Sequence, residues 1–187
     1  KIDFDLLSRE FAHTRRKNLL LRDLDELVNQ QLAKMLFANP QRIDYYDRYQ
    51  EIIDAYNAEQ NRATIEKTFM DLMELASSLD TEQQRYVREG FSSDEELSVY
   101  DLLFSEKLTK QEIETIKKVS VDLLTKIKQQ IAKLDHWTDK QETKAIVDNL
   151  IRNTLWQELP NSYDVSDIQT YQKKIYEYVY MRYPEVA

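Results

Sequence analysis

Cysteine is absent from this 187-residue sequence, and glycine occurs only once. Without cysteine the chain has no disulfides, no thiolate metal ligands and no cysteine nucleophile, which fits a reducing cytoplasm. A single glycine excludes a phosphate-binding loop or a dinucleotide fingerprint, because both need several glycines to bring backbone amides close to phosphate. Hairpins and β-sandwiches also depend on repeated turn residues. With one glycine and three prolines, the sequence predicts an all-α fold without a β-sheet.

Long apolar runs and a leader sequence are missing as well. The sequence has no stretch of about 18 apolar residues, so we expect no membrane span. Its first residues, Lys1 to Asp5, match neither a signal peptide nor a transit peptide. The chain also starts without methionine, which indicates a segment of a longer protein. We therefore expect a cytoplasmic helical fragment.

Acidic residues outnumber basic ones: 34 Asp and Glu against 26 Lys and Arg give a formal net charge of −8. A domain whose main task is to bind phosphates is normally basic, so this balance argues against DNA binding as the main role. Hydrophobic residues make up 42% and charged residues 32%, which is typical of a folded globular chain. The length suits one helical domain, 1–187, in which Ser105 to Thr109 is the best seam between sub-bundles 1–104 and 109–187.

Apolar residues recur at spacings of three and four along most of the chain. This period predicts an irregular bundle of about seven to eight amphipathic helices. The clearest periodic segments cover residues 19–37, 40–60, 64–79, 113–134 and 165–183. The run from Ile113 to Leu134 has a seven-residue rhythm that could form a coiled coil with a partner. Its apolar face is wider than a two-stranded seam, which favours a helix inside the bundle.

Capping residues predict where several helices begin. Thr109 pairs with Glu112 in a capping box, and Gly90 lies where a left-handed residue would end a short helix around Tyr86 and Val87. Further predicted caps are Asp80 and Thr81 before that short helix, Ser92 and Ser93 with Glu95 and Glu96, and Thr138 with Gln141.

One pair of residues has the spacing of a metal site. Glu10 and His13 have the i, i+3 spacing found in di-iron helix bundles, but such a site needs a second copy of the pair. The other histidine, His136, has Lys133 at the matching position. We therefore interpret His13 as a surface or helix-end residue, and the sequence predicts no metal-binding residue.

Catalytic patterns are equally sparse. Glu142-Thr143-Lys144 matches the Glu-x-Lys tripeptide of restriction nucleases, which work with a paired strand and a further acidic residue. Here the tripeptide lies in a helical segment, so we interpret it as a chance match. Neither histidine lies in a recognisable pattern with serine and aspartate, and no serine has glycine on both sides. The sequence predicts no catalytic or cofactor-binding residue.

Basic residues cluster at two places that could contact DNA. Arg15, Arg16 and Lys17 are consecutive, and Lys117 and Lys118 are adjacent in the long periodic run. Contacts with DNA phosphates are one interpretation of these residues. A solvated turn and a solvated helix face are the simpler interpretation. DNA guiding therefore stays open as an alternative function.

The segment from Asn39 to Asn57 is the most distinctive part of the chain. Pro40 ends one helical pattern and suits the first turn of the next. Two apolar rows then follow, one of Ile43, Tyr46, Tyr49, Ile53 and Tyr56, and one of Tyr45, Tyr49, Ile52 and Tyr56. The tyrosines predict a face that is partly buried and partly wet, because each hydroxyl needs a partner or water.

This segment, NPQRIDYYDRYQEIIDAYN, resembles the helical C-terminal region of the motor (R) subunits of Type I restriction-modification enzymes. Weaker blocks extend the resemblance to Thr64 to Phe69, Arg85 to Gly90 and Ile116 to Leu124. In that family an R subunit has a nuclease domain, RecA-like motor domains that hydrolyse ATP to pull DNA, and this helical end. The helical end is thought to dock the motor subunit on the methyltransferase core.

The resemblance implies a non-catalytic assembly module that binds the methyltransferase or specificity subunits of the same complex. ATP and Mg²⁺ would belong to the parent enzyme, a Type I site-specific deoxyribonuclease, and DNA would be reached only through the parent complex. Candidate protein-interface residues are Arg42, Tyr45, Arg48, Trp137, Tyr180 and Tyr183. The alternative for the aromatic residues is to fill gaps between helices, and we expect Trp156 to pack in the core.

Overall fold

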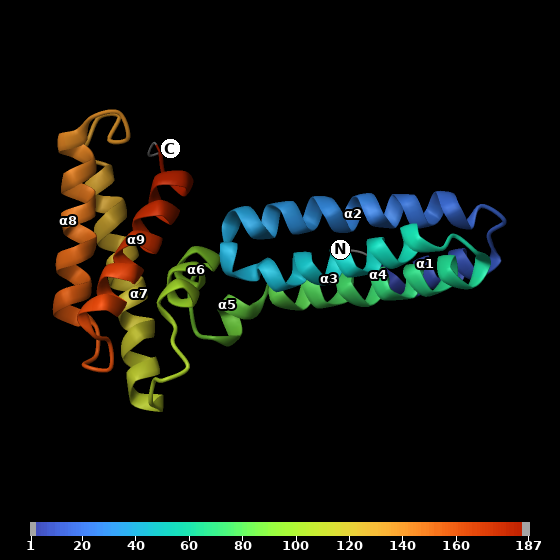
Figure 1. The fold of residues 1–187 in the computed structure, drawn as a ribbon, viewed down its shortest axis with the longest axis horizontal. Helices are drawn as coiled ribbons and strands as arrows, with labels where there is room; N and C mark the ends of the chain where they lie inside the picture. Colours follow the sequence, from blue (N-terminus) through green and yellow to red (C-terminus); the bar gives the residue numbers. More distant parts are fainter. Residues whose placement is uncertain (1–2, 185–187) are drawn as a thin grey trace. The chain divides into compact units, whose positions relative to one another are not determined.

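The computed structural model describes residues 3–184, and this part of the chain forms nine α-helices and one 3₁₀ helix without a strand (Figure 1). The prediction of an all-α fold is confirmed. The helices are α1 (Phe4–His13), α2 (Lys17–Ala38), η1 (Pro40–Arg42), α3 (Ile43–Ala58), α4 (Arg62–Glu82), α5 (Arg85–Arg88), α6 (Asp94–Leu103), α7 (Lys110–Ile131), α8 (Gln141–Glu158) and α9 (Val165–Arg182). Their number slightly exceeds the predicted seven to eight, and the short helix expected around Tyr86 and Val87 is present as the four-residue α5.

The chain divides into two compact units, Lys1–Arg85 and Tyr86–Ala187, and each has a hydrophobic core of its own. The predicted seam, Ser105 to Thr109, lies inside the second unit, because α6 before it packs against α7 and α9 after it. A loop between two helices of one core has the same local sequence signals as a loop between two cores. The sequence therefore could not place this boundary.

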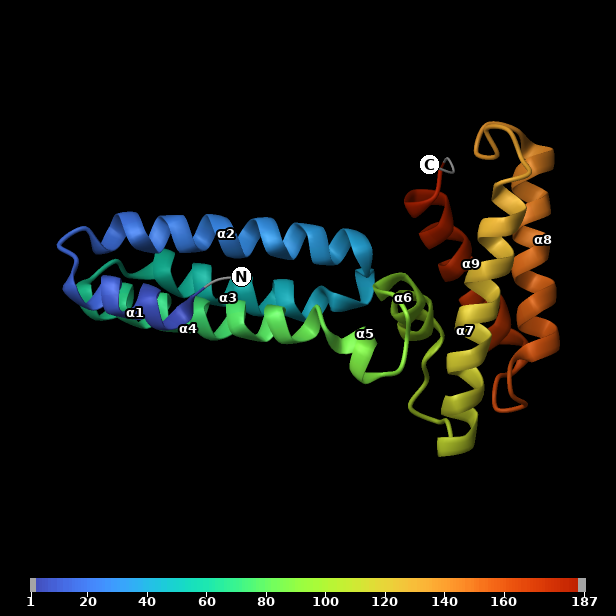
Figure 2. The same ribbon diagram turned by 180° about the vertical axis from the view of Figure 1, so that it is seen from behind.

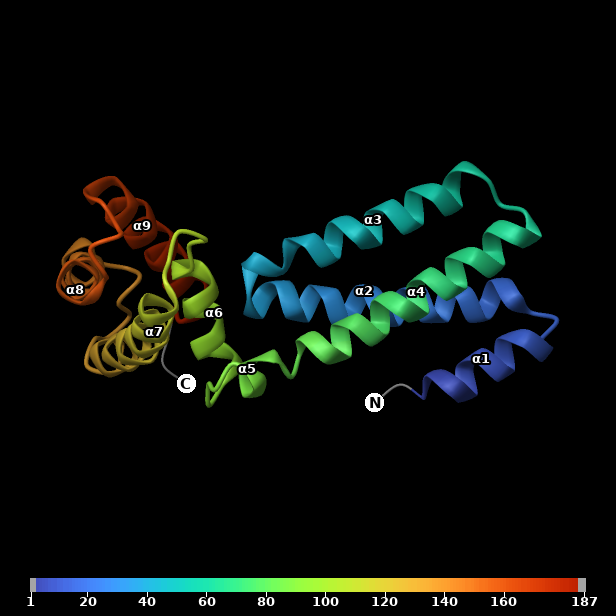
Figure 3. The same ribbon diagram turned by 90° about the horizontal axis from the view of Figure 1, so that it is seen from below.

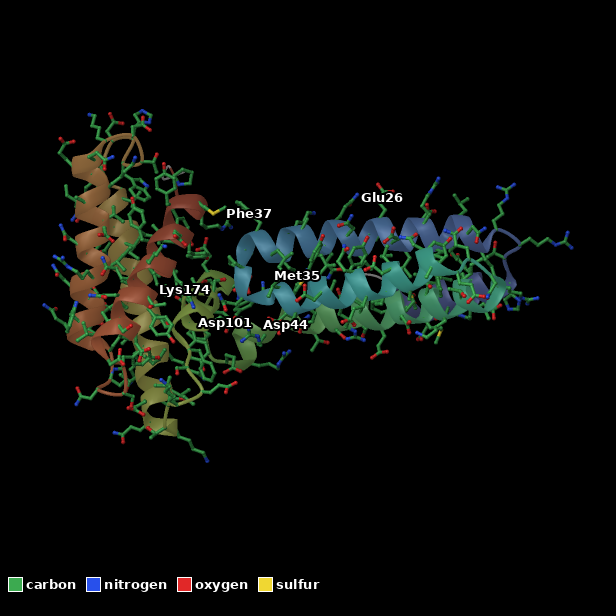
Figure 4. All side chains as sticks on the ribbon, in the orientation of Figure 1. Glu26, Met35, Phe37, Asp44, Asp101 and Lys174 are labelled. Atoms are coloured by element: carbon green, nitrogen blue, oxygen red, sulfur yellow. The ribbon has the colours of Figure 1, made fainter. Side chains whose placement is uncertain are left out.

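The first unit is built on α4, which packs along both α2 and α3. Those two helices meet at the η1 turn and diverge away from it (Figure 3). Met35 points from α2 into the unit, whereas Glu26 points away from it (Figure 4). The ring of Phe11 fixes α1 by stacking on Phe69 of α4 at a centroid distance of 3.7 Å.

Helix α3 buries one of its two predicted rows and leaves the other partly exposed. Tyr49 and Ile52 are buried in the core of the first unit. Ile43 and Tyr46, which belong only to the other row, are 48% and 36% exposed. Helices α2 and α4 therefore cover one side of α3, and an apolar edge stays at the surface.

In the second unit, α8 packs against both α7 and α9, and α6 contacts the same two helices (Figure 2). These four helices surround one core. Its fully buried members include Leu97, Leu103, Ile116, Leu123, Ile127, Val147, Ile151 and Ile175. Helix α6 is buried on nearly all sides, because Leu97, Ser98, Val99 and Tyr100 are consecutive and all buried.

Several predicted helix boundaries are confirmed by the caps. Thr109 and Glu112 form the expected capping box at the start of α7. Ser93 caps α6 by accepting a hydrogen bond from the amide of Glu96 at 3.3 Å. Gly90, which follows α5, has the left-handed φ of 84° expected there. Local sequence determines these ends, since each cap involves residues only three or four positions apart.

Other predicted caps are wrong. Asp80 and Thr81 do not start a helix, because α4 continues through them and Asp80 accepts a hydrogen bond from Gln31 of α2 at 3.1 Å. Thr138 does not cap α8, which begins after Lys140 without a side-chain cap. A contact from another helix competes with the local cap at Asp80, and that competition is invisible in the sequence.

Candidate protein-interaction surface

The 39–57 segment is held by contacts inside the first unit. Asn39 accepts a hydrogen bond from the amide of Gln41 at 3.1 Å and so caps η1. Arg42 is only 3% exposed, and its Nε donates to Glu82 Oε1 at 3.0 Å. Arg85 donates to both oxygens of the same carboxylate, at 2.9 and 3.0 Å. A buried charge needs such partners. Arg42 was predicted at a protein interface, but the structure places it in the interior of the first unit.

The tyrosines of α3 also bind inward. The hydroxyl of Tyr45 donates to Oε2 of the same carboxylate at 3.4 Å, and burial together with that charge raises the pKa of Tyr45. Tyr49 donates to Asp25 Oδ1 at 2.8 Å, and burial followed by this carboxylate raises the pKa of Tyr49 well above its usual value. Arg48 has a 41% exposed side chain and pairs with Glu74 of α4 at 3.0 Å. The motif therefore mainly fastens α3 to α2 and α4.

The predicted DNA-contact residues divide into paired and exposed side chains. Lys17 pairs with Glu66 at 3.0 Å, and its Nζ lies 4.6 Å from the ring centroid of Phe11. Lys117 pairs with Glu89 at 3.1 Å. The exposed members of the set are Arg15, Arg16 and Lys118. The two clusters belong to different compact units.

Trp137 lies at the centre of an aromatic cluster in the second unit. It is 1% exposed, and its indole Nε1 donates to the backbone carbonyl of Tyr183 at 2.6 Å. Its ring meets Tyr176 and Tyr180 edge-on, at centroid distances of 6.1 and 5.7 Å. Trp137 was predicted at a protein interface, but the structure places it in the core of the second unit. Burial also raises the pKa of Tyr183. Tyr180, which is 38% exposed, is the most exposed member of this cluster, whereas Tyr176 and Tyr183 are half-buried.

Trp156 was expected in the core, and the structure corrects this expectation: its side chain is 49% exposed. The buried row of α8 contains Val147, Ile151 and Leu155 at spacings of four. Trp156 lies one residue, or about 100°, beyond this row, so it points to the side of α8. A half-exposed tryptophan indicates a candidate contact surface, because tryptophan has a large apolar area and is normally highly buried.

A groove of about 460 Å³ lies between α8 and α9. We call it the α8–α9 groove; its lining includes Lys144, Ala145 and Asp148 of α8 and Gln169, Lys173 and Tyr176 of α9. Gln172 also lines it and donates to Asp148 Oδ1 at 2.9 Å. The ammonium of Lys144 lies 5.7 Å from the ring centroid of Tyr180. Burial, and then the charge of Asp148, raises the pKa of Tyr176.

Residues 3–184 contain no metal-binding cluster of histidines and carboxylates and no membrane-spanning helix. In this range no three His, Asp or Glu side chains come together in a way that could hold a metal ion. His13 is the last residue of α1, and Glu142 and Lys144 lie in the first turns of α8. None of the helices in the described range is both long enough and apolar enough to cross a membrane.

Sequence reasoning missed the inward partners of the motif and the α8–α9 groove. Nothing local distinguishes Glu82 or Asp25 among 34 acidic residues, so no signal could have found them. The side of α8 that carries the groove-lining Ala145 does have a signal, because Arg152 and Trp156 follow it at spacings of seven and four. Such a row on a second side of a helix indicates a second surface beside the core-facing one.

The fold and its surfaces define an all-α protein in which aromatic and apolar side chains remain partly exposed beside well-formed cores. The chain belongs to the family described as Type I restriction enzyme HindI endonuclease subunit-like, C-terminal, which matches residues 1–183. The resemblance drawn from the 39–57 segment is thereby confirmed. Neither a curated protein nor a solved structure matches the chain.

Proposed function

We propose that this chain joins the endonuclease subunit of a Type I restriction enzyme to the methyltransferase core of the same complex, and that it is itself non-catalytic. The observation that carries the proposal is the 49% exposure of Trp156 in a member of an endonuclease-subunit family. Tryptophan and tyrosine are the residues on which protein interfaces most often depend. The partner is the methyltransferase or the specificity subunit.

Other exposed apolar side chains of the second unit support the same function. Tyr180 is 38%, Val165 54% and Met181 71% exposed. Covering such side chains with a partner removes apolar surface from water, which contributes about 25 cal/mol for each Å². Covering the exposed apolar side chains of α8 and α9 would therefore contribute to the binding of the partner.

Deletion of this chain from its parent endonuclease subunit tests the proposal. We expect the shortened subunit to keep its ATPase activity but to lose association with the methyltransferase core, as measured by analytical ultracentrifugation. Equal association of the shortened and intact subunits would contradict the assembly role.

A point variant gives a sharper version of this test. Trp156→Ser should weaken association at least tenfold, because tryptophan anchors at interface centres contribute about 2 kcal/mol or more. The matched control is Met70→Ser, which removes a 63% exposed apolar side chain from α4 in the first unit. We expect this control to associate like the wild type.

The alternative function is the guiding of DNA by Arg15, Arg16, Lys17, Lys117 and Lys118. The exposure of Arg15, Arg16 and Lys118 favours it, whereas the ion pairs of Lys17 and Lys117 weaken it. A gel-shift of the 187-residue chain at about 50 and 200 mM salt is the test, since phosphate contacts weaken steeply with salt. Absence of binding at the lower concentration would exclude it for this chain.

A further inference from the structure

The α8–α9 groove differs in charge from the chain that carries it. The chain has a net charge of −8, yet Lys144 and Lys173 line the groove together with a single carboxylate, that of Asp148. Asp148 accepts a hydrogen bond from Gln172, and Glu177 lies 3.9 Å from Lys173, at the limit of an ion pair. The groove therefore offers cations whose charge is only partly compensated within the chain.

Helical spacing extends this groove along both helices. On α8, Arg152 and Trp156 follow the groove-lining Ala145 at spacings of seven and four, so the three share one side of the helix. On α9 the corresponding row is Val165, Gln169, Gln172, Tyr176 and Tyr180. The two helices are consecutive and pack against each other, so Trp156 and Val165 both lie near the loop that joins them.

We propose that the α8–α9 groove binds one acidic amphipathic helix of a partner subunit, and this proposal rests on the assembly role described above. Carboxylates of that helix pair with Lys144, Lys173 and Arg152, and its apolar edge covers Trp156 and Val165. Opposite charge selects this occupant, because complementary potentials steer association and suppress wrong partners. The 18-residue α8 and α9 are each about 27 Å long, which accommodates a helix of similar length.

A nucleic acid backbone fits the groove less well. Regularly spaced phosphates would come close to Asp148 and would enter the field of a chain with a net charge of −8. An amphipathic helix places its few carboxylates only where the cations are. The amides of Gln169 and Gln172 also suit carboxylates, since each supplies N–H donors.

A pair of designed peptides tests the proposal on the 187-residue chain. Both form a helix of about 18 residues with leucines at i, i+3, i+4 and i+7, flanked by glutamates in one and by lysines in the other. Tryptophan emission reports binding, because Trp156 is 49% exposed while the other tryptophan, Trp137, is 1% exposed. We expect the glutamate peptide to shift the emission to the blue and to bind at least tenfold more tightly than the lysine peptide.

Charge reversal supplies the matched variants. The double variant Lys144→Glu and Lys173→Glu should reverse the preference between the two peptides. Lys118→Glu changes an exposed lysine of α7 by the same charge and should leave the preference unchanged. Equal affinity for both peptides, or no binding of either, would overturn the proposal. Duplex DNA that binds with a steep salt dependence, and is lost in the double variant, would also overturn it in favour of a phosphate site.

The failure of this proposal and that of the assembly role can be told apart. If deletion of the chain leaves subunit association unchanged while the glutamate peptide still binds, the assembly role fails and the groove stands. If the deletion abolishes association while the double variant associates normally, the assembly role stands and the groove is not the docking site.

Discussion

At the scale of single residues, the interior of the first unit depends on Glu82. Glu82 is 5% exposed, and its carboxylate accepts hydrogen bonds from Arg42 of η1, Tyr45 of α3 and Arg85 of α5. A buried ion pair adds little net stability by itself, but removing one partner leaves the other charge buried without compensation. The network therefore holds the η1 turn to the end of α4.

We expect Glu82→Gln to destabilise the first unit by about 3–5 kcal/mol, because it removes the carboxylate that both guanidinium groups share. Arg42→Ala should cost less, since Arg85 continues to compensate Glu82. Arg48→Ala breaks an exposed pair and should change the free energy of unfolding by no more than about 1 kcal/mol. Urea unfolding followed by circular dichroism measures all three variants, and equal losses would contradict this account.

At the scale of helices, side chains at the first turn determine where α7 begins. Glu112 accepts hydrogen bonds from the hydroxyl of Ser162 and from the amide of Thr109, the latter at 2.8 Å. These two contacts, the one from Ser162 first, hold the pKa of Glu112 below its usual range. One capping residue thus joins the start of α7 to the loop before α9.

A pH dependence follows from this cap. Since the folded-state pKa of Glu112 is lowered, its contribution is fully present above the unfolded pKa of about 4.3 and is lost as pH falls through the folded pKa. Glu112→Gln should therefore lose less stability than the wild type on acidification from pH 5 to about pH 3. Thermal unfolding at several pH values measures the slope of stability against pH. Glu114→Gln, at a 69% exposed side chain of the same helix, should keep the wild-type slope, and equal slopes for both variants would refute the role of the cap.

At the scale of the whole molecule, the chain has two hydrophobic cores in two compact units. Residues of one core contact each other through helices of the same unit, such as α2, α3 and α4 in the first and α6 to α9 in the second. A hydrophobic core of its own makes each unit a candidate for independent cooperative unfolding.

We expect residues 86–187, expressed alone, to keep the helix content of the second unit and to unfold in one cooperative transition. The physical reason is that its buried core residues and the partly buried apolar side chains packed against them all lie within that range. Circular dichroism during thermal unfolding is the measurement. A gradual loss of signal without a transition would show that the second unit needs the first.

Much of the fold could be predicted from the sequence because helices depend on local interactions. One glycine and three prolines left helices as the remaining option, and the period of apolar residues placed the long ones. Caps such as Thr109 with Glu112 were predictable, because both partners lie within one turn. The 39–57 segment was distinctive enough to indicate the family, which the match over residues 1–183 confirms.

Which candidate residues are buried could not be predicted, because burial depends on which helices pack together. Trp137 lies in a connection between helices, where no period predicts whether a side chain is buried. Trp156 lies one residue past the buried row of α8, so a small rotation about the helix axis separates core from surface.

The sequence by itself therefore determined the helical class, most helix positions and the family of this protein. Only the tertiary structure decided that Arg42 is internal, that Trp137 is buried and Trp156 half-exposed, and that Lys144 and Lys173 line one groove between α8 and α9. The reason is physical: helix formation is set by neighbours within one or two turns, whereas burial and local charge are set by residues far apart in the chain.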